Sequence, residues 1–481
     1  MSNRLIIGII IISVFLGAAT LTRGHDWGDD FASYIMQAGS ILNNSTRDFV
    51  ERNSFTIFES SNQIGPVAYP WGYPVILTPV YAIKGIHPLA LKLPGLLFYA
   101  GFLICLYLLM KKRLTQTESL VLVSLFAFNP LLLQFLDQIL SDIPFLFFST
   151  LGLLLLSDQN KDNDIHSAVI GIIIFFAFFF RTTGILLLAS FVAFEILTIP
   201  GHYANRDQTR RRWRNVLITC LTFGFLFLIN LWLFPGGEMS HLALYQKFEV
   251  ETALGFTRAY FQVFDLFFGE ALAWKIIYYI VFAFFLLGMW IKRNEELLFI
   301  VFFSFWMILL ITWPAWQGPR FIFPLLPVFI YFAFQGMKFV VGKLPGAYTW
   351  TGQWLFYGFW LSIIGVFLLH SGANAYINLQ NERGINGPFD PYSREVYSYI
   401  KEKTAPDSVI VFFKPRVMAM MTEHPSLMST ECDRMLKGEY IVLSRKVGEN
   451  QQIPPEEIDA CNLPLNQVLK NNRFIVYEIQ K

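Results

Sequence analysis

Charged side chains are scarce in this chain of 481 residues. Asp, Glu, Lys and Arg make up 15% of it and hydrophobic residues 54%, whereas a soluble domain carries about 25% charge. This composition excludes an ordinary soluble protein and indicates that lipid surrounds most of the chain. The formal net charge of +2 gives no reason to expect a nucleic-acid partner. The sequence also lacks a phosphate-binding glycine loop, a His/Cys spacing typical of zinc, and internal repeats.

Cysteine is rare as well, with four residues in the whole chain. Cys105 and Cys220 fall in apolar runs, where cysteine acts as a small core residue. Cys432 and Cys461 fall in the polar C-terminal region, and they could form a disulfide if that region faces an oxidising compartment. The sequence leaves this pairing open.

Long apolar runs are what the chain has in abundance. A helix that crosses a bilayer needs about 20 mostly apolar residues, and about eleven runs come close to that length. The first run is expected to be an anchor, because no small-residue cleavage site precedes His25. The expected spans are 4–21, 89–110, 117–136, 142–157, 165–180, 183–199, 215–234, 274–291, 297–313, 321–337 and 350–370.

Basic residues set the expected orientation of these spans. If the N-terminus is cytoplasmic, the inner loops collect the clusters Lys111–Arg113 and Arg210–Arg214, and the outer loops carry only scattered Lys and Arg. One span more or fewer between the clusters would place them on opposite sides of the membrane. We therefore expect a mainly α, polytopic membrane protein with its N-terminus inside and its C-terminus outside.

Two domains follow from this reading. Residues 1–370 form the transmembrane module, with outer loops at about 22–88 and 235–273, and residues 371–481 form a small extracytoplasmic α/β domain. Within that domain the pattern predicts helices at Pro391–Thr404, 415–422 and 465–470, and strands at Ser408–Phe413, Tyr440–Ser444 and Arg473–Ile479.

Ionisable residues near the spans gather on the expected outer side. The first outer loop opens with His25-Asp26-Trp27-Gly28-Asp29-Asp30, and Asp137 and Asp142 flank the outer turn between the third and fourth spans. Arg181 and Arg320 lie at the outer ends of later spans. Each alone reads as an ordinary interfacial charge, but the set on one side favours a functional site.

Such a set suits one kind of chemistry. A carboxylate can act as general base on an acceptor hydroxyl or amine, and arginines hold a phosphate through paired donors. Because no ATP is available outside the cell, an activated lipid is a sensible donor. The pattern therefore indicates transfer of a group from a lipid phosphate to an acceptor.

Four short motifs occur in order along the chain. They are Asp29-Asp30-Phe31-Ala32-Ser33-Tyr34, Tyr69-Pro70-Trp71-Gly72-Tyr73-Pro74, Arg181-Thr182-Thr183-Gly184 and Gly318-Pro319-Arg320-Phe321. Each motif alone carries little information, but their order and their placement relative to the spans make the combination fairly specific. In these motifs the sequence resembles bacterial members of the GT-C superfamily of membrane glycosyltransferases, in the branch of protein O-mannosyltransferases and aminoarabinose transferases. The resemblance covers about residues 5–370.

The resemblance implies roles for the acids. An aspartate of the first outer loop would be the catalytic base. The tyrosine four residues after the key acid selects Asp30, and registering the motif one residue earlier selects Asp29. Asp142, or else Asp137, would be the second acid, which orients the acceptor or helps to hold a divalent metal ion.

The resemblance also implies a donor site. Arg320 and Arg181 would bind the donor phosphate, and Tyr69, Tyr73 and Lys84 would line the donor groove. His25 together with Asp29 and Asp30 has the ligand types for zinc or a harder cation, but their spacing is loose and favours a solvated loop over a metal site.

The expected function is an integral membrane glycosyltransferase of the cell inner (plasma) membrane. It would move a sugar from a polyprenyl-phosphate donor to a lipid, glycan or secreted-protein acceptor on the extracytoplasmic side. The alternative is a polytopic transporter or lipid flippase, but transporters place broken helices and ionisable groups at the midplane, often in paired repeats, and the sequence has neither. A scaffold whose C-terminal region docks a partner is a third interpretation.

Overall fold

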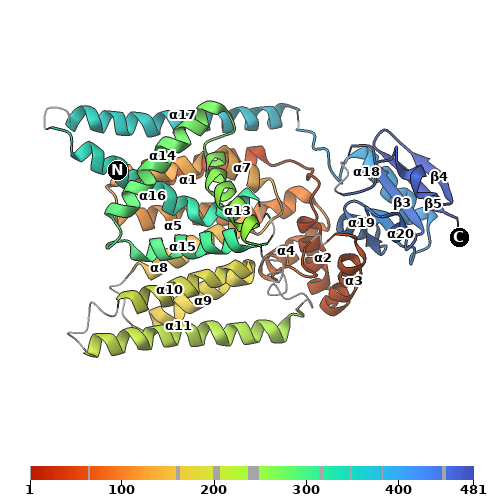
Figure 1. Cartoon of the computed structure of the whole chain (residues 1–481), viewed down its shortest axis with the longest axis horizontal. Helices are drawn as coiled ribbons and strands as arrows, with labels where there is room; N and C mark the ends of the chain where they lie inside the picture. Colours follow the sequence, from red (N-terminus) through yellow and green to blue (C-terminus); the bar gives the residue numbers. More distant parts are fainter. Residues whose placement is uncertain are drawn as a thin grey trace.

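The computed structural model describes the chain apart from residues 1, 63–64, 159–162, 199–205, 237–248, 315, 317, 346–348, 382, 447–450 and 481. It consists of a bundle of long apolar helices, three shorter helices at one end of the bundle, and a small domain with a sheet beyond them (Figure 1). The N-terminus lies at the far end of the bundle from the C-terminal domain (Figure 1). The mainly helical membrane architecture with a small α/β domain is therefore confirmed.

Every apolar run of the sequence overlaps a helix of the bundle. By length and composition, five helices of the described residues can cross a membrane, or six if a bent pair counts as one span, and five further apolar helices have 10–17 residues. Eleven complete spans therefore remains a prediction. The bundle helices are α1 (Ser2–Thr20), α5 (Pro88–Lys111), α6 (Gln116–Ala127), α7 (Pro130–Leu136), α8 (Asp142–Leu156), α9 (Asp164–Phe180), α10 (Ile185–Thr198), α11 (Arg206–Leu233), α14 (Leu272–Ile291), α15 (Leu297–Thr312), α16 (Leu326–Gly342) and α17 (Thr349–Asn381).

The bent pair is α6 and α7, which meet at 52°. Asn129 stands before Pro130, and a residue before proline disfavours the helical conformation. The Asn129 side chain accepts a hydrogen bond from the Leu132 amide at 3.2 Å and so caps α7. The bend carries the end of α7 toward the first-loop helices.

Helices α14 and α16 pack backbone against backbone. A Cβ atom on Gly288 would lie 1.8 Å from the Phe332 carbonyl oxygen, and one on Gly336 would lie 2.0 Å from the Phe284 oxygen. Only glycine permits this approach. It fixes α16 and the 3-10 segment η5 (Pro319–Leu325) that precedes it.

Three helices of the first loop lie between the bundle and the C-terminal domain (Figure 1). They are α2 (Asp30–Leu42), α3 (Thr46–Glu59) and α4 (Gly72–Lys84). The second long loop contains α13 (Val250–Val263) and η4 (Phe264–Phe267). The first loop is thus a folded layer.

The C-terminal domain is a five-stranded sheet with helices packed against it, one of which contacts α2. The strand order is β2-β1-β3-β5-β4, with β1 parallel to both β2 and β3, and with β5 antiparallel to both β3 and β4. Its elements are α18 (Pro391–Lys403), β1 (Ile410–Phe412), α19 (Pro415–Thr422), β2 (Ser426–Leu427), α20 (Cys432–Met435), β3 (Tyr440–Ser444), η7 (Ile458–Cys461), β4 (Leu465–Lys470) and β5 (Phe474–Ile479).

The predicted helix at 465–470 is wrong, because this segment is strand β4. It pairs antiparallel with β5, from Leu465 opposite Ile479 to Lys470 opposite Ile475, with an irregularity between Gln467 and Leu469. Six residues are too few for a hydrophobic period to separate helix from strand. The hydrogen bonds offered by the edge of β5 decide the conformation instead. The other predicted elements of the domain are confirmed, and β2 and α20 were not anticipated.

A disulfide joins Cys432 in α20 to Cys461 in η7, across a sequence separation of 29 residues. Cys105 and Cys220 are free thiols. The structure therefore supplies the pairing that the sequence left open.

We expect Cys461→Ser to lower the free energy of unfolding of the C-terminal domain by about 3–4 kcal/mol, because the crosslink restricts the unfolded chain. Urea-dependent proteolysis of the purified full-length protein under non-reducing conditions would measure the loss. Cys220→Ser is the matched control and should change the midpoint by no more than about 0.5 kcal/mol. Equal midpoints for Cys461→Ser and the wild type would contradict the prediction.

Candidate functional site

A cavity of about 570 Å³ lies where the first loop, the end of α7, the segment η5 and the C-terminal domain meet. This volume is in the usual range for small-molecule sites, about 300–1,000 Å³. The side chains around it are mostly polar or charged. Its lining residues are His25, Asp26, Gly28, Asp29, Asp30, Phe31, Asn62, Gln134, Phe135, Gln138, Leu140, Arg320, Phe413, Lys414, Met428 and Gln451.

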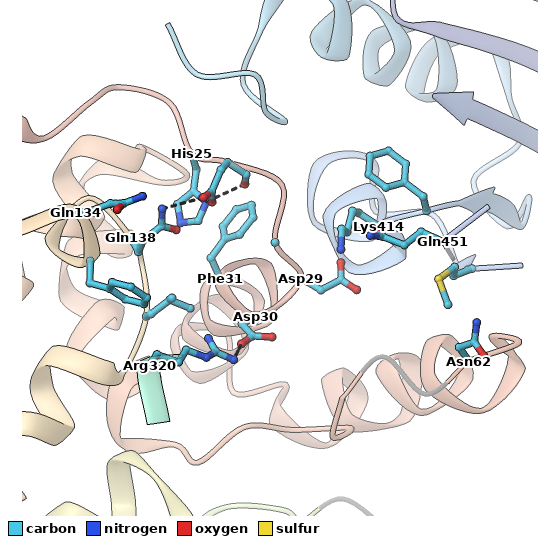
Figure 2. Close-up of a pocket in the computed structure, with 16 residues that line it drawn as sticks. His25, Asp29, Asp30, Phe31, Asn62, Gln134, Gln138, Arg320, Lys414 and Gln451 are labelled. Atoms are coloured by element: carbon cyan, nitrogen blue, oxygen red, sulfur yellow. Dashed lines mark hydrogen bonds and ion pairs between the residues drawn. The ribbon is translucent and has the colours of Figure 1, made fainter. Parts of the chain in front are cut away.

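An ion pair between Asp30 and Arg320 stands in the wall of this cavity (Figure 2). Arg320 Nη2 donates to Asp30 Oδ2 at 2.6 Å, and the Tyr69 hydroxyl donates to Asp30 Oδ1 at 2.5 Å. Burial alone would raise the pKa of Asp30, but the Arg320 charge and the Tyr69 hydrogen bond outweigh it and lower the pKa below its ordinary value. Asp30 is therefore a carboxylate at neutral pH.

Helix α2 positions both Asp30 and Tyr69. Asp30 is its first residue, and Gln37 follows two turns later on the same helix. The fully buried Gln37 side chain donates to the Tyr69 carbonyl at 2.9 Å and accepts from the Tyr69 amide at 3.2 Å. Helix α2 therefore fixes the position of Tyr69 relative to Asp30. Sequence reasoning missed Gln37, although a polar residue seven positions after the key acid was a usable signal.

Asp142 is the shared counter-ion of two arginines. Arg181 Nη1 donates to Asp142 Oδ1, and Arg320 Nη1 lies 3.9 Å from Asp142 Oδ2. The Asp142 side chain is only 2% exposed and does not line the cavity. The Arg181 guanidinium also lies over the Phe321 ring, 4.2 Å from its centre. The structure therefore brings Asp30, Asp142, Arg181 and Arg320 together.

Asp29 faces a different surface from its neighbour. Its side chain turns toward Lys414 of the C-terminal domain (Figure 2), and the backbone amide of Val417 in α19 favours its charged form. Burial raises the pKa of Asp29 to about 6, although the charges of Arg416 and Lys414 act in the opposite direction. Two adjacent acids thus have separate partners.

Asp137 belongs to another buried network, outside the cavity lining. Its carboxylate accepts from Lys92 Nζ at 2.6 Å, from the Thr22 amide at 2.7 Å and from Arg383 Nη2 at 2.8 Å. The Lys92 side chain is 0% exposed. This network ties the end of α1, helix α5, the end of α7 and the segment after α17 together.

The two remaining donor-groove candidates also lie outside the cavity lining. Tyr73 is buried with its ring edge-on to Tyr34, the two centres 5.2 Å apart. Lys84 is exposed at the last position of α4. It stands about 16 Å along the helix from Tyr73, since each residue adds about 1.5 Å.

His25, Asp29 and Asp30 do not fit a metal site. His25 Nε2 accepts a hydrogen bond from the Ile139 amide at 3.1 Å, and its ring stacks on Phe31 with centres 3.9 Å apart. The two aspartates turn to different partners. Throughout the part of the chain that the structure describes, no group of three His, Cys, Asp or Glu side chains is placed to hold a metal ion.

The C-terminal domain contributes residues that sequence reasoning did not assign to the site. Lys414 and Gln451 line the cavity, and Arg416 lies beside Tyr69 with its ring centre 5.4 Å away. A usable signal was the segment Lys414-Pro415-Arg416, which places two cations at a helix start directly after an apolar strand.

Comparisons with known proteins place this geometry in context. Residues 68–232 match the family model for dolichyl-phosphate-mannose-protein mannosyltransferase. The structure of ArnT from Cupriavidus metallidurans in the apo state aligns over 99% of this chain and 98% of its own, at 11% identity and a TM-score of 0.58. The oligosaccharyltransferase of Archaeoglobus fulgidus in the apo form aligns over 99% of this chain and 74% of its own, at 10% identity and a TM-score of 0.59.

The chain resembles the GT-C superfamily of membrane glycosyltransferases. The resemblance expected from the four motifs is thereby confirmed, and the shared GT-C fold includes the C-terminal domain, because the ArnT alignment covers 99% of this chain. A search of curated protein sequences finds no match.

We expect Asp137→Asn to destabilise this GT-C-like bundle by about 3–5 kcal/mol, because it leaves Lys92 buried without a counter-charge. Lys92→Met should cost less, since Asp137 keeps Arg383 and Thr22. The midpoint of heat-induced aggregation in detergent would measure both effects. An Asp137→Asn protein with wild-type thermal stability and no activity would instead make Asp137 a member of the active site.

Proposed function

We propose that this protein is an integral membrane glycosyltransferase that moves a sugar from a polyprenyl-phosphate donor to an acceptor on the extracytoplasmic side of the inner membrane. The observation that carries the proposal is the Asp30–Arg320 pair in a polar cavity at one end of an apolar bundle. The relatives support the donor class. One ArnT structure is bound to undecaprenyl phosphate, at 11% identity and a TM-score of 0.57, and an archaeal oligosaccharyltransferase was solved with a dolichol-phosphate.

The arginines form the donor side of the proposed site. Arg320 and Arg181 present donors around Asp142, and guanidinium groups match phosphate oxygens in pairs. As the bond from the sugar to phosphate breaks, negative charge gathers on the phosphate oxygen. A fixed guanidinium stabilises this charge more than it stabilises the intact donor.

Asp30 is the proposed general base. The acceptor oxygen or nitrogen attacks the anomeric carbon, the bond from that carbon to the phosphate oxygen breaks, and its electron pair leaves with polyprenyl phosphate. The proton of the acceptor passes to Asp30. Because its pKa is lowered, Asp30 is ionised at neutral pH and can accept this proton. The hydrogen bond from the Tyr69 hydroxyl to Oδ1 fixes the orientation of the carboxylate.

The remaining cavity wall supports a hydroxylated acceptor. Amide side chains of Asn62, Gln134, Gln138 and Gln451 line it, and each amide both donates and accepts. The Oε1 atom of Gln451 is buried without a hydrogen-bond partner among the described residues. Sugar hydroxyl groups would satisfy such a wall, so a glycan or glycolipid acceptor suits it better than an apolar one.

We expect Asp30→Asn to lower the rate of polyprenyl phosphate release at least about 100-fold, because the acceptor loses its base. The assay incubates the purified protein in lipid with a panel of polyprenyl-phosphate sugars and membrane extract, and detects free polyprenyl phosphate by mass spectrometry. Glu51→Gln, on the exposed face of α3, is the control and should keep the wild-type rate.

Wild-type protein that releases no polyprenyl phosphate, yet moves a labelled lipid across reconstituted vesicles, would replace the proposed transferase with the transporter or flippase alternative. Full release by Asp30→Asn would keep a transferase but remove Asp30 as its base.

The proposed orientation predicts which exposed positions a membrane-impermeant maleimide can reach. In a Cys220→Ser background, Glu402→Cys in α18 should react in intact spheroplasts, because the proposed orientation places it outside the membrane. Arg211→Cys in α11 should react only after permeabilisation, because the same orientation places it inside. Both positions are exposed and so accessible to the reagent. Cys105 is buried, and Cys432 and Cys461 are joined to each other. The reverse labelling pattern would overturn the proposed sidedness.

A further inference from the structure

We propose that Arg416 of the C-terminal domain is a positioning residue of the active site, which orients the Tyr69 hydroxyl and through it the carboxylate of Asp30. The C-terminal domain would then contribute a residue to the active site. This inference rests on the function proposed above and extends it to a residue far outside the four motifs.

Arg416 is withdrawn from water at the junction of the two domains. It is the second residue of α19, and its side chain is 0% exposed. A buried cation is costly unless it is paired. Nevertheless, among the described residues no carboxylate lies within ion-pair distance of its guanidinium, and its Nε has no hydrogen-bond partner. Packing alone does not account for an arginine at this position.

The guanidinium is directed at Tyr69 instead. Its Nη2 donates to the Pro66 carbonyl, its Nη1 lies 3.5 Å from the Tyr69 hydroxyl oxygen, and its Cζ stands 5.4 Å from the Tyr69 ring centre. Arginine has donors only, so the Tyr69 oxygen accepts and its own hydrogen is left for Asp30 Oδ1 at 2.5 Å. A hydroxyl that accepts one hydrogen bond becomes a stronger donor in the next.

The backbone is shaped around this contact. Gly65 has φ +133°, a conformation that side chains with a Cβ rarely adopt. A Cβ atom there would lie 3.0 Å from the Tyr69 hydroxyl oxygen and 3.2 Å from Arg416 Nη1. The charge of Arg416 also lowers the pKa of both Asp29 and Asp30. Both adjacent acids therefore face the start of α19.

Other contacts hold the C-terminal domain in place without Arg416. Arg434 Nη1 donates to the Ser60 carbonyl at 3.1 Å, the Ser61 amide donates to the Met428 carbonyl at 2.9 Å, and Lys437 pairs with Glu59. A change at Arg416 therefore alters the site while the docking remains. This makes the positioning role separable from a structural one.

The proposal predicts the titration of Asp30. Burial raises its pKa, and three groups lower it: Arg320 from η5, Tyr69 from the segment before α4, and Arg416 from α19. Its neighbour Asp29 faces Arg416, Lys414 and the Val417 amide. Since Arg416 favours the ionised carboxylate, its removal raises the pKa of Asp30. The acidic limb of the activity profile then moves to higher pH.

The test compares Arg416→Gln and Arg416→Lys in the polyprenyl phosphate release assay across pH. We expect Arg416→Gln to lower kcat about tenfold or more, which corresponds to about 1.4 kcal/mol, with the donor KM within about twofold and the acidic limb shifted upward. Arg416→Lys should recover part of kcat and most of the pH shift, because it restores the charge and one donor.

Arg434→Gln is the matched control, because it removes a docking arginine of the same domain away from Tyr69. It should keep the wild-type kcat and pH profile. Wild-type kcat and pH profile in Arg416→Gln would overturn the proposal, and so would an equal loss in Arg434→Gln. If Arg416→Gln fails to fold, the kcat of Arg416→Lys decides instead: a partial loss supports the proposal, and a wild-type kcat overturns it.

A second measurement, of the protonation of Asp30, does not depend on catalytic activity. Infrared difference spectra during pH titration report carboxylate protonation, and the band lost in Asp30→Asn identifies Asp30. Arg416→Gln, or Arg416→Lys to a smaller degree, should raise the midpoint of that band. An unchanged midpoint overturns the positioning role, whereas a raised midpoint in a protein that releases no polyprenyl phosphate supports it and refutes only the proposed function.

Discussion

A charge that folding removes from water must find a partner, and this requirement organises the structure. Asp30 from the first loop and Arg320 from the late segment η5 are 290 positions apart, yet they meet at 2.6 Å. Asp142 then holds Arg320 and Arg181 together, while Lys92 and Asp137 tie the helix ends nearby. Because leaving any of these groups unpaired would cost several kcal/mol, the ion pairs stabilise this arrangement of the loops at the end of the bundle.

Much of this could be predicted from the sequence, for identifiable reasons. Apolar runs of spanning length mark helices whatever their partners, and charges at the same ends of the spans must share one end of the bundle. Asp30, Asp142, Arg181 and Arg320 therefore meet as expected. The partner of Asp137 was not accessible, because Lys92 lies within an apolar run and only packing turns it toward the carboxylate. Strand β4 likewise depends on the free edge of β5.

The start of helix α2 directs the side chains of Asp29 and Asp30 toward different partners. Asp29 precedes α2 and Asp30 begins it, so their side chains leave the backbone in different directions. One meets the arginine of the bundle and the other meets the helix α19 of the C-terminal domain. Sequence motifs treat the pair as alternatives for one role. In the structure the charge of Arg320 and the hydrogen bond from Tyr69 outweigh burial at Asp30 and lower its pKa, whereas burial at Asp29 outweighs the charges of Arg416 and Lys414 and raises its pKa.

The contact between Arg416 and Tyr69 also has a consequence for biosynthesis. The ribosome adds Arg416 347 positions after Tyr69, when nearly the whole bundle has already been made. Under the proposed function, a chain released before that point would lack the residue that we propose orients the base. It would embed in the membrane with a lowered rate of sugar transfer. The order of translation would then delay full activity until the C-terminal domain has folded.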